Sequence, residues 1–161
     1  MAGCDLPVIR IMPNTPVAVG QGLTLFCANE LVEPEELEDF LQDMSYSGIL
    51  DPVPETLFDN AGTVSGCGPA YMYMFIEALA DGAVACGVPR KQAIEYAAAT
   101  MLGAAEMVLQ TGQHPGALKD AVCSPGGSTI AGLKALEDGG FRAAVMNCIM
   151  AAAKRNSELG K

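Results

Sequence analysis

Residues 70–86 read AYMYMFIEALADGAVAC, and this apolar run from Ala70 to Cys86 decides the fold that the sequence predicts. The run is shorter than the roughly 20 apolar residues that cross a bilayer, and it contains Glu77 and Asp81. Because these two acids are four residues apart, they share one face of a helix and leave most of its surface apolar. We therefore expect a helix that is buried on several sides, and no membrane partner.

Near residue 57 the chain changes from mixed strand and helix signals to helix signals alone. Glycine and proline separate the predicted helices, which span residues 55–62, 68–86, 89–111, 115–122, 128–137 and 141–159. The helix at 89–111 is rich in alanine, which permits close approach of a neighbouring helix. Two long apolar helices in a chain this short need a partner subunit to cover them, so we expect a homodimer or a larger homo-oligomer.

The first 56 residues predict a small α/β segment. Residues 7–12 and 22–27 favour strands and are separated by a loop. A helix is expected to begin at Pro34, with carboxylates in its first turn, where the helix dipole favours them. Residues 47–54 follow as a last extended segment, which gives the order strand, strand, helix, strand.

The composition excludes several classes of function. Hydrophobic residues make up 50% of the 161 residues, charged residues only 17%, and the mean hydropathy is +0.27, which excludes a disordered chain. A net charge of −10 and a pI near 4.3 lack the basic surface that binds a phosphate backbone. Nucleic acid is therefore not an expected partner.

The chain has six cysteines, at positions 4, 27, 67, 86, 123 and 148, and none of them forms a Cys-x-x-Cys pair. This scatter predicts reduced thiols in a cytoplasmic protein, most of them small buried residues without chemistry. His114 is the single histidine, so no ligand spacing predicts a metal site. The first residues lack a basic stretch followed by an apolar run, so no signal peptide is predicted.

Two motifs near strand and helix ends allow both a structural and a functional interpretation. Pro13-Asn14-Thr15-Pro16 ends the first predicted strand, where Asn14 either forms an ordinary turn or presents its amide to a ligand at the sheet edge. Ser65-Gly66-Cys67-Gly68-Pro69-Ala70 predicts a loop that leads into the long helix, with Pro69 in the first turn. Its glycines resemble a phosphate cradle, but close packing of helix against sheet is the favoured interpretation.

The stretch Cys123-Ser124-Pro125-Gly126-Gly127-Ser128-Thr129 is the strongest candidate for a binding site. Hydroxyl groups and free backbone N–H groups converge there at the start of a helix, which suits a carboxylate or a phosphate. A capped helix with a glycine-rich approach is the alternative. Upstream, Lys119 and Asp120 form either a solvated pair or a charged wall of the same pocket, and His114 is interpreted as a turn or helix-start residue.

Several stretches match one family in their order along the chain. They are Val8-Ile9-Arg10 with Met12 to Pro16, Ser65 to Tyr71, His114-Pro115-Gly116 with Leu118-Lys119-Asp120, Ser124 to Ile130, and Leu136-Glu137 with Gly139 to Arg142. Together they resemble the motif set of the pyrroline-5-carboxylate reductase family, from residue 8 to about residue 159.

The resemblance implies a mainly α fold. Its helical dimerisation domain would be of the 6-phosphogluconate-dehydrogenase-like C-terminal type, preceded by a short α/β remnant of a Rossmann domain. The resemblance also implies the last step of proline synthesis. In that step NADPH or NADH delivers a hydride to the C=N carbon of 1-pyrroline-5-carboxylate, and L-proline is formed.

The resemblance further implies roles for individual residues. The residues that would hold the substrate are Ser124, Gly126, Gly127, Ser128 and Thr129. The Thr129 hydroxyl would contact the ring nitrogen and is the candidate catalytic group. Asn14 and Thr15 would lie near the nicotinamide end of the cofactor.

The sequence also departs from the family. Family members begin with a complete dinucleotide-binding half, but no Gly-x-Gly-x-x-Gly follows a strand near the start of this sequence. We expect residues 1–56 to be the closing strands and helix of a truncated dinucleotide-binding domain, and residues 57–161 to be the helical dimerisation and substrate domain. A smaller departure is Cys67, which stands where the family usually has serine.

Two other interpretations stay open. One is the C-terminal domain of another NAD(P)-dependent dehydrogenase, although the hydroxyacid dehydrogenases carry a catalytic lysine on the long helix and residues 70–88 contain none. The other is a non-catalytic helical oligomerisation module. Binding of proline or of a five-membered-ring analogue would separate an enzyme of proline synthesis from a scaffold.

Overall fold

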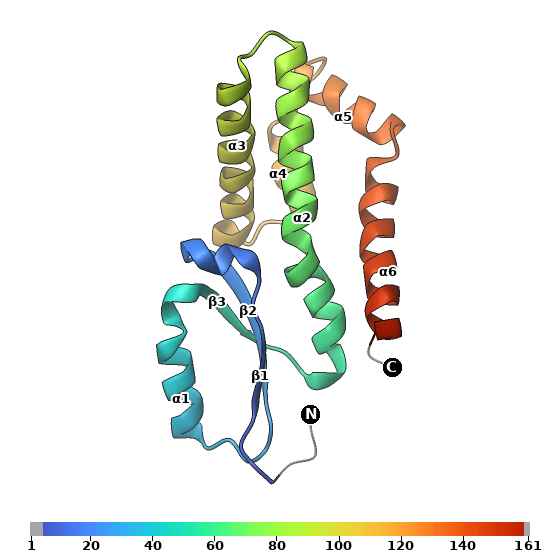
Figure 1. Cartoon of the computed structure of the whole chain (residues 1–161). Coiled ribbons are helices and arrows are strands. Elements are labelled where there is room, and N and C mark those ends of the chain that lie inside the picture. The colour runs from blue at the N-terminus through green and yellow to red at the C-terminus, as the bar shows by residue number, and fades with distance from the viewer. Residues whose placement is uncertain (1–4, 160–161) are drawn as a thin grey trace. The chain divides into compact units, whose positions relative to one another are not determined.

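The computed structural model describes residues 5–159, and within them α-helices dominate, as predicted (Figure 1). The strands are β1 (Ile9–Met12), β2 (Gly22–Ala28) and β3 (Gly48–Pro52). The α-helices are α1 (Pro34–Asp43), α2 (Glu55–Ala85), α3 (Arg90–Thr111), α4 (Pro115–Ala121), α5 (Ser128–Asp138) and α6 (Phe141–Leu159). Two short 3-10 helices, η1 (Thr15–Val19) and η2 (Ser45–Ser47), precede β2 and β3.

The three strands form one sheet in the order β1-β2-β3. β1 runs antiparallel to β2, with Ile11 opposite Phe26, and β3 runs parallel to β2. The parallel pair is joined through α1, which packs on the sheet by an edge-to-face contact between Phe26 and Phe40 at 5.5 Å. The predicted order of strand, strand, helix and strand is confirmed.

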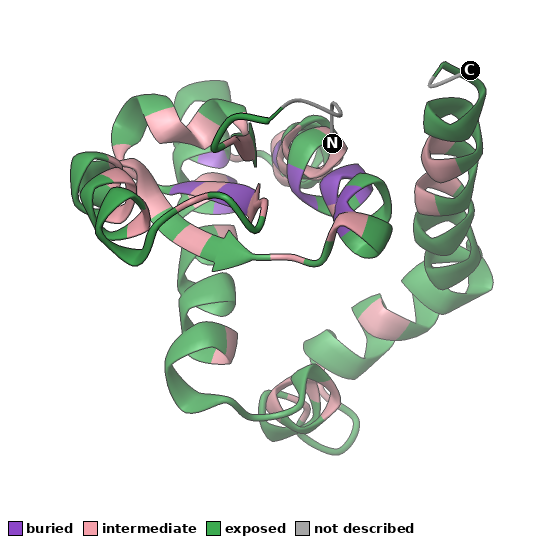
Figure 2. Cartoon of the chain, turned by 90° about the horizontal axis from the view of Figure 1, so that it is seen from below, coloured by how far each residue is buried: buried purple, intermediate pink, exposed green. Residues whose placement is uncertain are grey.

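The prediction of two separate helices at residues 55–62 and 68–86 is wrong. The structure has a single helix, α2, that runs through the predicted loop and contains Pro69 in its interior. Glycine and proline lower helix propensity, but packing overrides it here because Phe58, Thr63 and Ser65 of α2 are buried. Figure 2 shows buried positions on the first part of α2 and others on β2.

The expectation that Gly66 and Gly68 allow close packing against the sheet is also wrong. A Cβ added at either residue would meet no atom within 4 Å. The close approach occurs one turn earlier, at Gly62, where a Cβ would lie 2.1 Å from the Sδ of Met12. Close packing of α2 against the sheet therefore occurs at the end of β1, at a glycine that the sequence did not single out.

The chain divides into two compact units. The first comprises residues 1–71 and 148–161, and the second comprises residues 72–147. The division falls inside α2 and α6, whereas the boundary predicted from the sequence, between residues 56 and 57, marks where the chain becomes helical. That sequence boundary stays a prediction.

The second unit is built around a pair of helices. The latter part of α2 and α3 are joined by a short turn in which Gly87 has a φ of 93°. Their contact is made of small residues, Ala80, Ala93 and Ala97, with Ile76, Ala83, Val84 and Val88 packed around them. The acid on the polar face of α2, Asp81, pairs with Arg90 across the turn at 2.6 Å. The close helix pairing predicted from the alanine-rich sequence is confirmed.

These helices also expose large apolar side chains. Exposed residues on α2 include Met72, Tyr73, Met74 and Leu79, and those on α3 include Ile94, Tyr96, Leu102, Met107 and Leu109. The expected burial of α2 on several sides is therefore not provided by the chain itself. Among residues 5–159, no helix has the length and apolar character needed to cross a membrane.

The described cysteines, at positions 27, 67, 86, 123 and 148, form no disulfide with one another, and Cys4 lies outside the described residues. The expectation that most cysteines are buried is wrong for these five, because Cys86 is exposed and the other four are half-buried. Cys86 ends up exposed because it follows the last turn of α2, at the tip of the helix pair.

Candidate functional site

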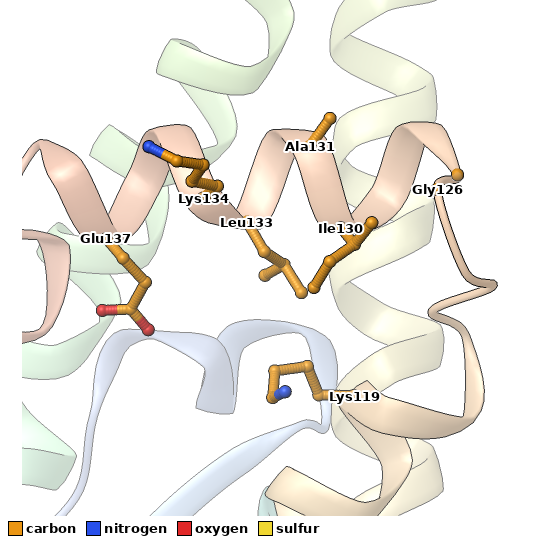
Figure 3. Close-up of a pocket in the computed structure, with 8 residues that line it drawn as sticks. Lys119, Gly126, Ile130, Ala131, Leu133, Lys134 and Glu137 are labelled. Carbon is orange, nitrogen blue, oxygen red and sulfur yellow. The ribbon is translucent and has the colours of Figure 1, made fainter.

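A pocket of about 570 Å³ lies between α4 and α5 (Figure 3). Its lining residues are Lys119, Gly126, Gly127, Ile130, Ala131, Leu133, Lys134 and Glu137. Positions 130, 133, 134 and 137 follow helical spacing along α5. Figure 3 shows Ile130 and Leu133 on the side of α5 that faces Lys119. The pocket therefore has an apolar wall with a lysine opposite it.

The glycine-rich loop enters this pocket at the N-terminus of α5. Gly126 has a φ of 69°, a left-handed conformation that favours glycine. A Cβ on Gly127 would lie 2.4 Å from the Oγ of Ser124, so the loop closes tightly at this point. Gly126 is thus favoured by its backbone conformation, and Gly127 by the small space beside Ser124.

The N-terminus of α5 keeps its backbone donors open. Gly127 is the N-cap residue and, among residues 5–159, no side chain caps this helix end. The first intrahelical bond runs from the Ala131 N–H to the Gly127 carbonyl, at 3.3 Å. The N–H groups of Ser128, Thr129 and Ile130, which precede Ala131, have no acceptor within the helix. Open N–H groups and the positive end of the helix dipole favour an anion there.

The charged side chains around the pocket are engaged in ion pairs. Lys119 pairs with Asp120, and this hydrogen bond raises the pKa of the Lys119 ammonium. Lys134 pairs with Asp138 along α5. Lys119 is thus both a member of a solvated pair and a wall of the pocket, which combines the two interpretations that the sequence left open.

Glu137 at the far end of the pocket is also paired. Its Oε1 accepts a hydrogen bond from the Nε of Arg142 at 2.6 Å, and this bond raises the pKa of the Arg142 guanidinium. Because these side chains have partners already, the open backbone N–H groups of α5 are the best available donors for an anion.

The predicted substrate-binding residues Ser124, Gly126, Gly127, Ser128 and Thr129 lie together in this loop and the first turn of α5. Gly126 and Gly127 line the pocket, whereas Ser128 and Thr129 are exposed and do not line it. The contribution of Ile130, Leu133 and Lys134 to the pocket was not predicted from the sequence. Their helical spacing after the glycine pair was the available signal.

The predicted cofactor-binding residues Asn14 and Thr15 lie in the first unit, and the candidate substrate residues lie in the second. Thr15 is exposed at the start of η1. The Asn14 side chain is half-buried and hydrogen-bonded at both ends: its Oδ1 accepts from the Leu23 N–H at 2.9 Å, and its Nδ2 donates to the Ser65 carbonyl at 3.0 Å. Both bonds reach distant segments, so the Asn14 side chain does not form the ordinary Asx-type turn, and its role at a cofactor site stays a prediction.

His114 is the N-cap residue of α4, as predicted. Its Nδ1 accepts a hydrogen bond from the Gly116 N–H at 3.0 Å. An imidazole nitrogen can accept only in the neutral form. This geometry gives His114 a local structural role at the start of α4.

The structure defines a class of protein: a helical domain with an uncapped helix N-terminus beside a pocket, preceded by a small α/β segment. Residues 55–159 match the family described as pyrroline-5-carboxylate reductase dimerisation. The chain belongs to the pyrroline-5-carboxylate reductase family.

Individual relatives agree with this assignment. The chain is 49% identical over 157 residues to a pyrroline-5-carboxylate reductase of Synechocystis, covering 98% of this chain and 59% of the relative. It is 47% identical over 159 residues to the reductase of Escherichia coli, covering 99% of this chain and 59% of that protein. The chain thus spans about three fifths of the length of these curated relatives.

Solved structures of the family have the same fold. The pyrroline carboxylate reductase of Plasmodium falciparum, solved with NADP bound, aligns with a TM-score of 0.91 at 37% identity. The alignment covers 100% of this chain and 65% of that structure. A pyrroline-5-carboxylate reductase from Coxiella burnetii aligns with a TM-score of 0.90 at 36% identity, covering 99% of this chain and 59% of that structure.

Proposed function

We propose that this chain is the substrate-binding and dimerising part of a pyrroline-5-carboxylate reductase, which reduces 1-pyrroline-5-carboxylate to L-proline with NADPH or NADH. The observation that carries the proposal is the open N-terminus of α5 beside the pocket that Lys119 lines. A carboxylate is the part of this substrate that such a helix end favours.

The proposed substrate contacts follow from the loop. The carboxylate would accept hydrogen bonds from the open backbone N–H groups that follow Gly127, at Ser128 and Thr129, with the Ser124 hydroxyl beside it. The Thr129 hydroxyl would hydrogen-bond to the ring nitrogen and hold the C=N bond in a fixed orientation. Reduction requires a hydride at the C=N carbon and a proton on the nitrogen, so a hydroxyl at the nitrogen is well placed to assist.

The proposed cofactor contact is limited to the nicotinamide end. The loop from Pro13 to Pro16 follows β1, and its Thr15 hydroxyl is exposed and able to meet a ligand. When bound, NADPH or NADH would supply the hydride. Asn14 and Thr15 fit the border of such a site, while the described residues contain no glycine-rich cradle for the pyrophosphate.

We also propose a homodimer or a larger homo-oligomer and a cytoplasmic location. The exposed apolar side chains of α2 and α3 support a second copy as the partner, because such surfaces are normally covered. The described cysteines form no disulfide with one another, which is compatible with a reducing compartment.

Calorimetric titration of the chain with L-proline tests the proposal, with L-prolinamide as the matched ligand that lacks the carboxylate. We expect binding of proline and at least about tenfold weaker binding of the amide, because hydrogen bonds to a charged group contribute about 1.5–3 kcal/mol. A non-catalytic oligomerisation module would bind neither ligand.

Two glycine variants on the same loop and helix provide the control. Gly127→Ala places a Cβ 2.4 Å from the Ser124 Oγ and should weaken proline binding, whereas Gly132→Ala meets nothing within 4 Å and should leave binding unchanged. Equal affinities for the two variants would contradict a site at the α5 N-terminus.

A further inference from the structure

The proline inside α2 removes one hydrogen bond of the helix. In an α-helix each N–H donates to the carbonyl four residues earlier, and Pro69 has no N–H. The carbonyl that loses its donor is that of Ser65. Ser65 is only 4% exposed, so water cannot readily replace the missing donor. A buried carbonyl without a donor is costly, which makes its actual partner informative.

The actual partner is the side chain of Asn14. Its Nδ2 donates to the Ser65 carbonyl at 3.0 Å, from a loop 51 positions earlier in the chain. Its Oδ1 accepts from the Leu23 N–H at 2.9 Å. One amide group therefore joins the loop after β1, the start of β2 and the interior of α2.

A second contact lies on the same face of α2. The Sδ of Met12 packs where a Cβ of Gly62 would be, three residues before Ser65. Positions three apart on a helix are neighbours on its surface. The residues on either side of Pro13 are thus both held against one face of α2, by packing at Met12 and by hydrogen bonding at Asn14.

We propose that Asn14 is a positioning residue that replaces the helix hydrogen bond removed by Pro69 and thereby fixes the loop from Pro13 to Pro16 on α2. The Asn14 amide compensates for the proline inside the helix. In turn, the Ser65 carbonyl that Pro69 leaves without its helix donor is the acceptor for the Asn14 Nδ2. Both prolines of the loop restrict its backbone, so one side-chain anchor is enough to fix it.

This inference deepens the proposed function and rests on it in one respect: the loop from Pro13 to Pro16 is taken to border the nicotinamide site. The Asn14 amide uses its oxygen and one N–H inside the protein. Of the two predicted cofactor residues, Asn14 and Thr15, the exposed Thr15 is therefore the one left to meet a nicotinamide. Asn14 would act on the reaction through the position of Thr15.

A double-mutant cycle on the chain, measured without cofactor or substrate, tests the anchor. Asn14→Asp keeps an acceptor for the Leu23 N–H but removes the donor to Ser65. Pro69→Ala restores an N–H that can donate to Ser65 within the helix. We expect Asn14→Asp to raise the unfolding equilibrium constant about tenfold, or about 1.4 kcal/mol, in the parent chain and no more than about threefold in the Pro69→Ala background.

Asn29 provides a matched control in the same unit. Its Oδ1 accepts from the Val8 N–H at 3.1 Å and its Nδ2 donates to the Leu6 carbonyl at 2.9 Å, so Asn29→Asp removes a comparable donor far from Pro69 in sequence. We expect the effects of Asn29→Asp and Pro69→Ala to be additive. If Asn14 had only a general structural role, Pro69→Ala would not reduce the loss of stability caused by Asn14→Asp.

Amide hydrogen exchange at Leu23 gives a local readout that does not depend on global unfolding. The Leu23 N–H should stay protected in Asn14→Asp and lose protection in Asn14→Ala. If Asn14→Asp lowers the free energy of unfolding by the same amount with and without Pro69, the proposal is overturned. Because no ligand is present, that result would leave the proposed function untouched, which the proline titration decides separately.

Discussion

The Sδ of Met12 occupies the space beside Gly62, where an added Cβ would lie only 2.1 Å away. Met12 is the last residue of β1, and Gly62 is a buried position on α2. The absence of a side chain at Gly62 therefore lets a strand end and a helix approach each other, next to the loop that carries Asn14 and Thr15.

Because of this contact, Gly62→Ala should have opposite effects on stability in the parent chain and in a Met12→Ala background. Gly62→Ala should destabilise the parent chain by about 1 kcal/mol or more, because the methionine must move out of its packed position. In a Met12→Ala background the same change should stabilise the chain by about 0.5–1 kcal/mol, since alanine favours a helix more than glycine does. Urea unfolding of the four chains measures both effects, and destabilisation of similar size in both backgrounds would contradict the packing.

The ion pairs of Arg10 predict a specific loss of stability in acid. Arg10 bonds Glu55 at 2.7 Å and Asp59 at 2.6 Å, and its guanidinium lies 4.2 Å from the ring centre of Phe58. Desolvation raises the pKa of Glu55, but favourable interactions, of which the hydrogen bond and the charge of Arg10 are the largest, leave this pKa below its ordinary value of 4.5. The stabilisation is therefore present above 4.5 and is lost as the pH falls through the lower folded value.

Melting temperatures measured from about pH 6 to about pH 3 check this prediction. Glu55→Gln should flatten the acid part of the profile relative to the parent chain. Arg10→Met should flatten it in part, because it removes the main partner that lowers the pKa of Glu55. Parallel profiles for the parent and Glu55→Gln would rule out a contribution from this pair.

The exposed apolar face of α2 predicts self-association. Met74 is 73% exposed, and burial of one side chain of that size contributes about 1.5–3 kcal/mol to an interface. Light scattering at micromolar concentration should give a multiple of the 16.7 kDa chain mass. Met74→Arg should shift the chain toward the monomer, whereas Tyr46→Arg, at a residue of η2 that is 92% exposed, should not. A monodisperse parent chain of 16.7 kDa would refute the prediction.

If the Thr129 hydroxyl contacts the substrate, its removal should lower turnover much more than it lowers stability. In an enzyme that joins this chain to a dinucleotide-binding half, Thr129→Ala should lower kcat/KM about ten- to a hundredfold, the effect of losing one positioned hydrogen bond of about 1–3 kcal/mol. Thr129→Ser keeps the hydroxyl and should be much milder. Both melting temperatures should stay close to that of the parent, because Gly127 is the N-cap and no side chain of residues 5–159 caps α5. Parent-like kinetics with a lowered melting temperature in Thr129→Ala would give Thr129 a helix-building role only.

The sequence by itself determined where α4 and α5 begin and that a glycine-rich loop precedes α5. Local signals suffice there, because Pro115 and the Gly126-Gly127 pair act within one or two turns of their own positions. The order of strands and helices in the first 56 residues follows from the same kind of local pattern. His114 was likewise recognisable as a helix-start residue from its neighbour Pro115.

Only the tertiary structure decided the continuity of α2 and the role of Asn14. Proline and glycine at positions 66–69 indicate a helix start, and no local signal reveals that Ser65 receives a donor from a residue 51 positions earlier. The same applies to Gly62, whose small size matters because Met12 packs against it. Sequence patterns report local backbone preference, whereas a hydrogen bond between distant segments can reverse that preference by satisfying the group that proline leaves free.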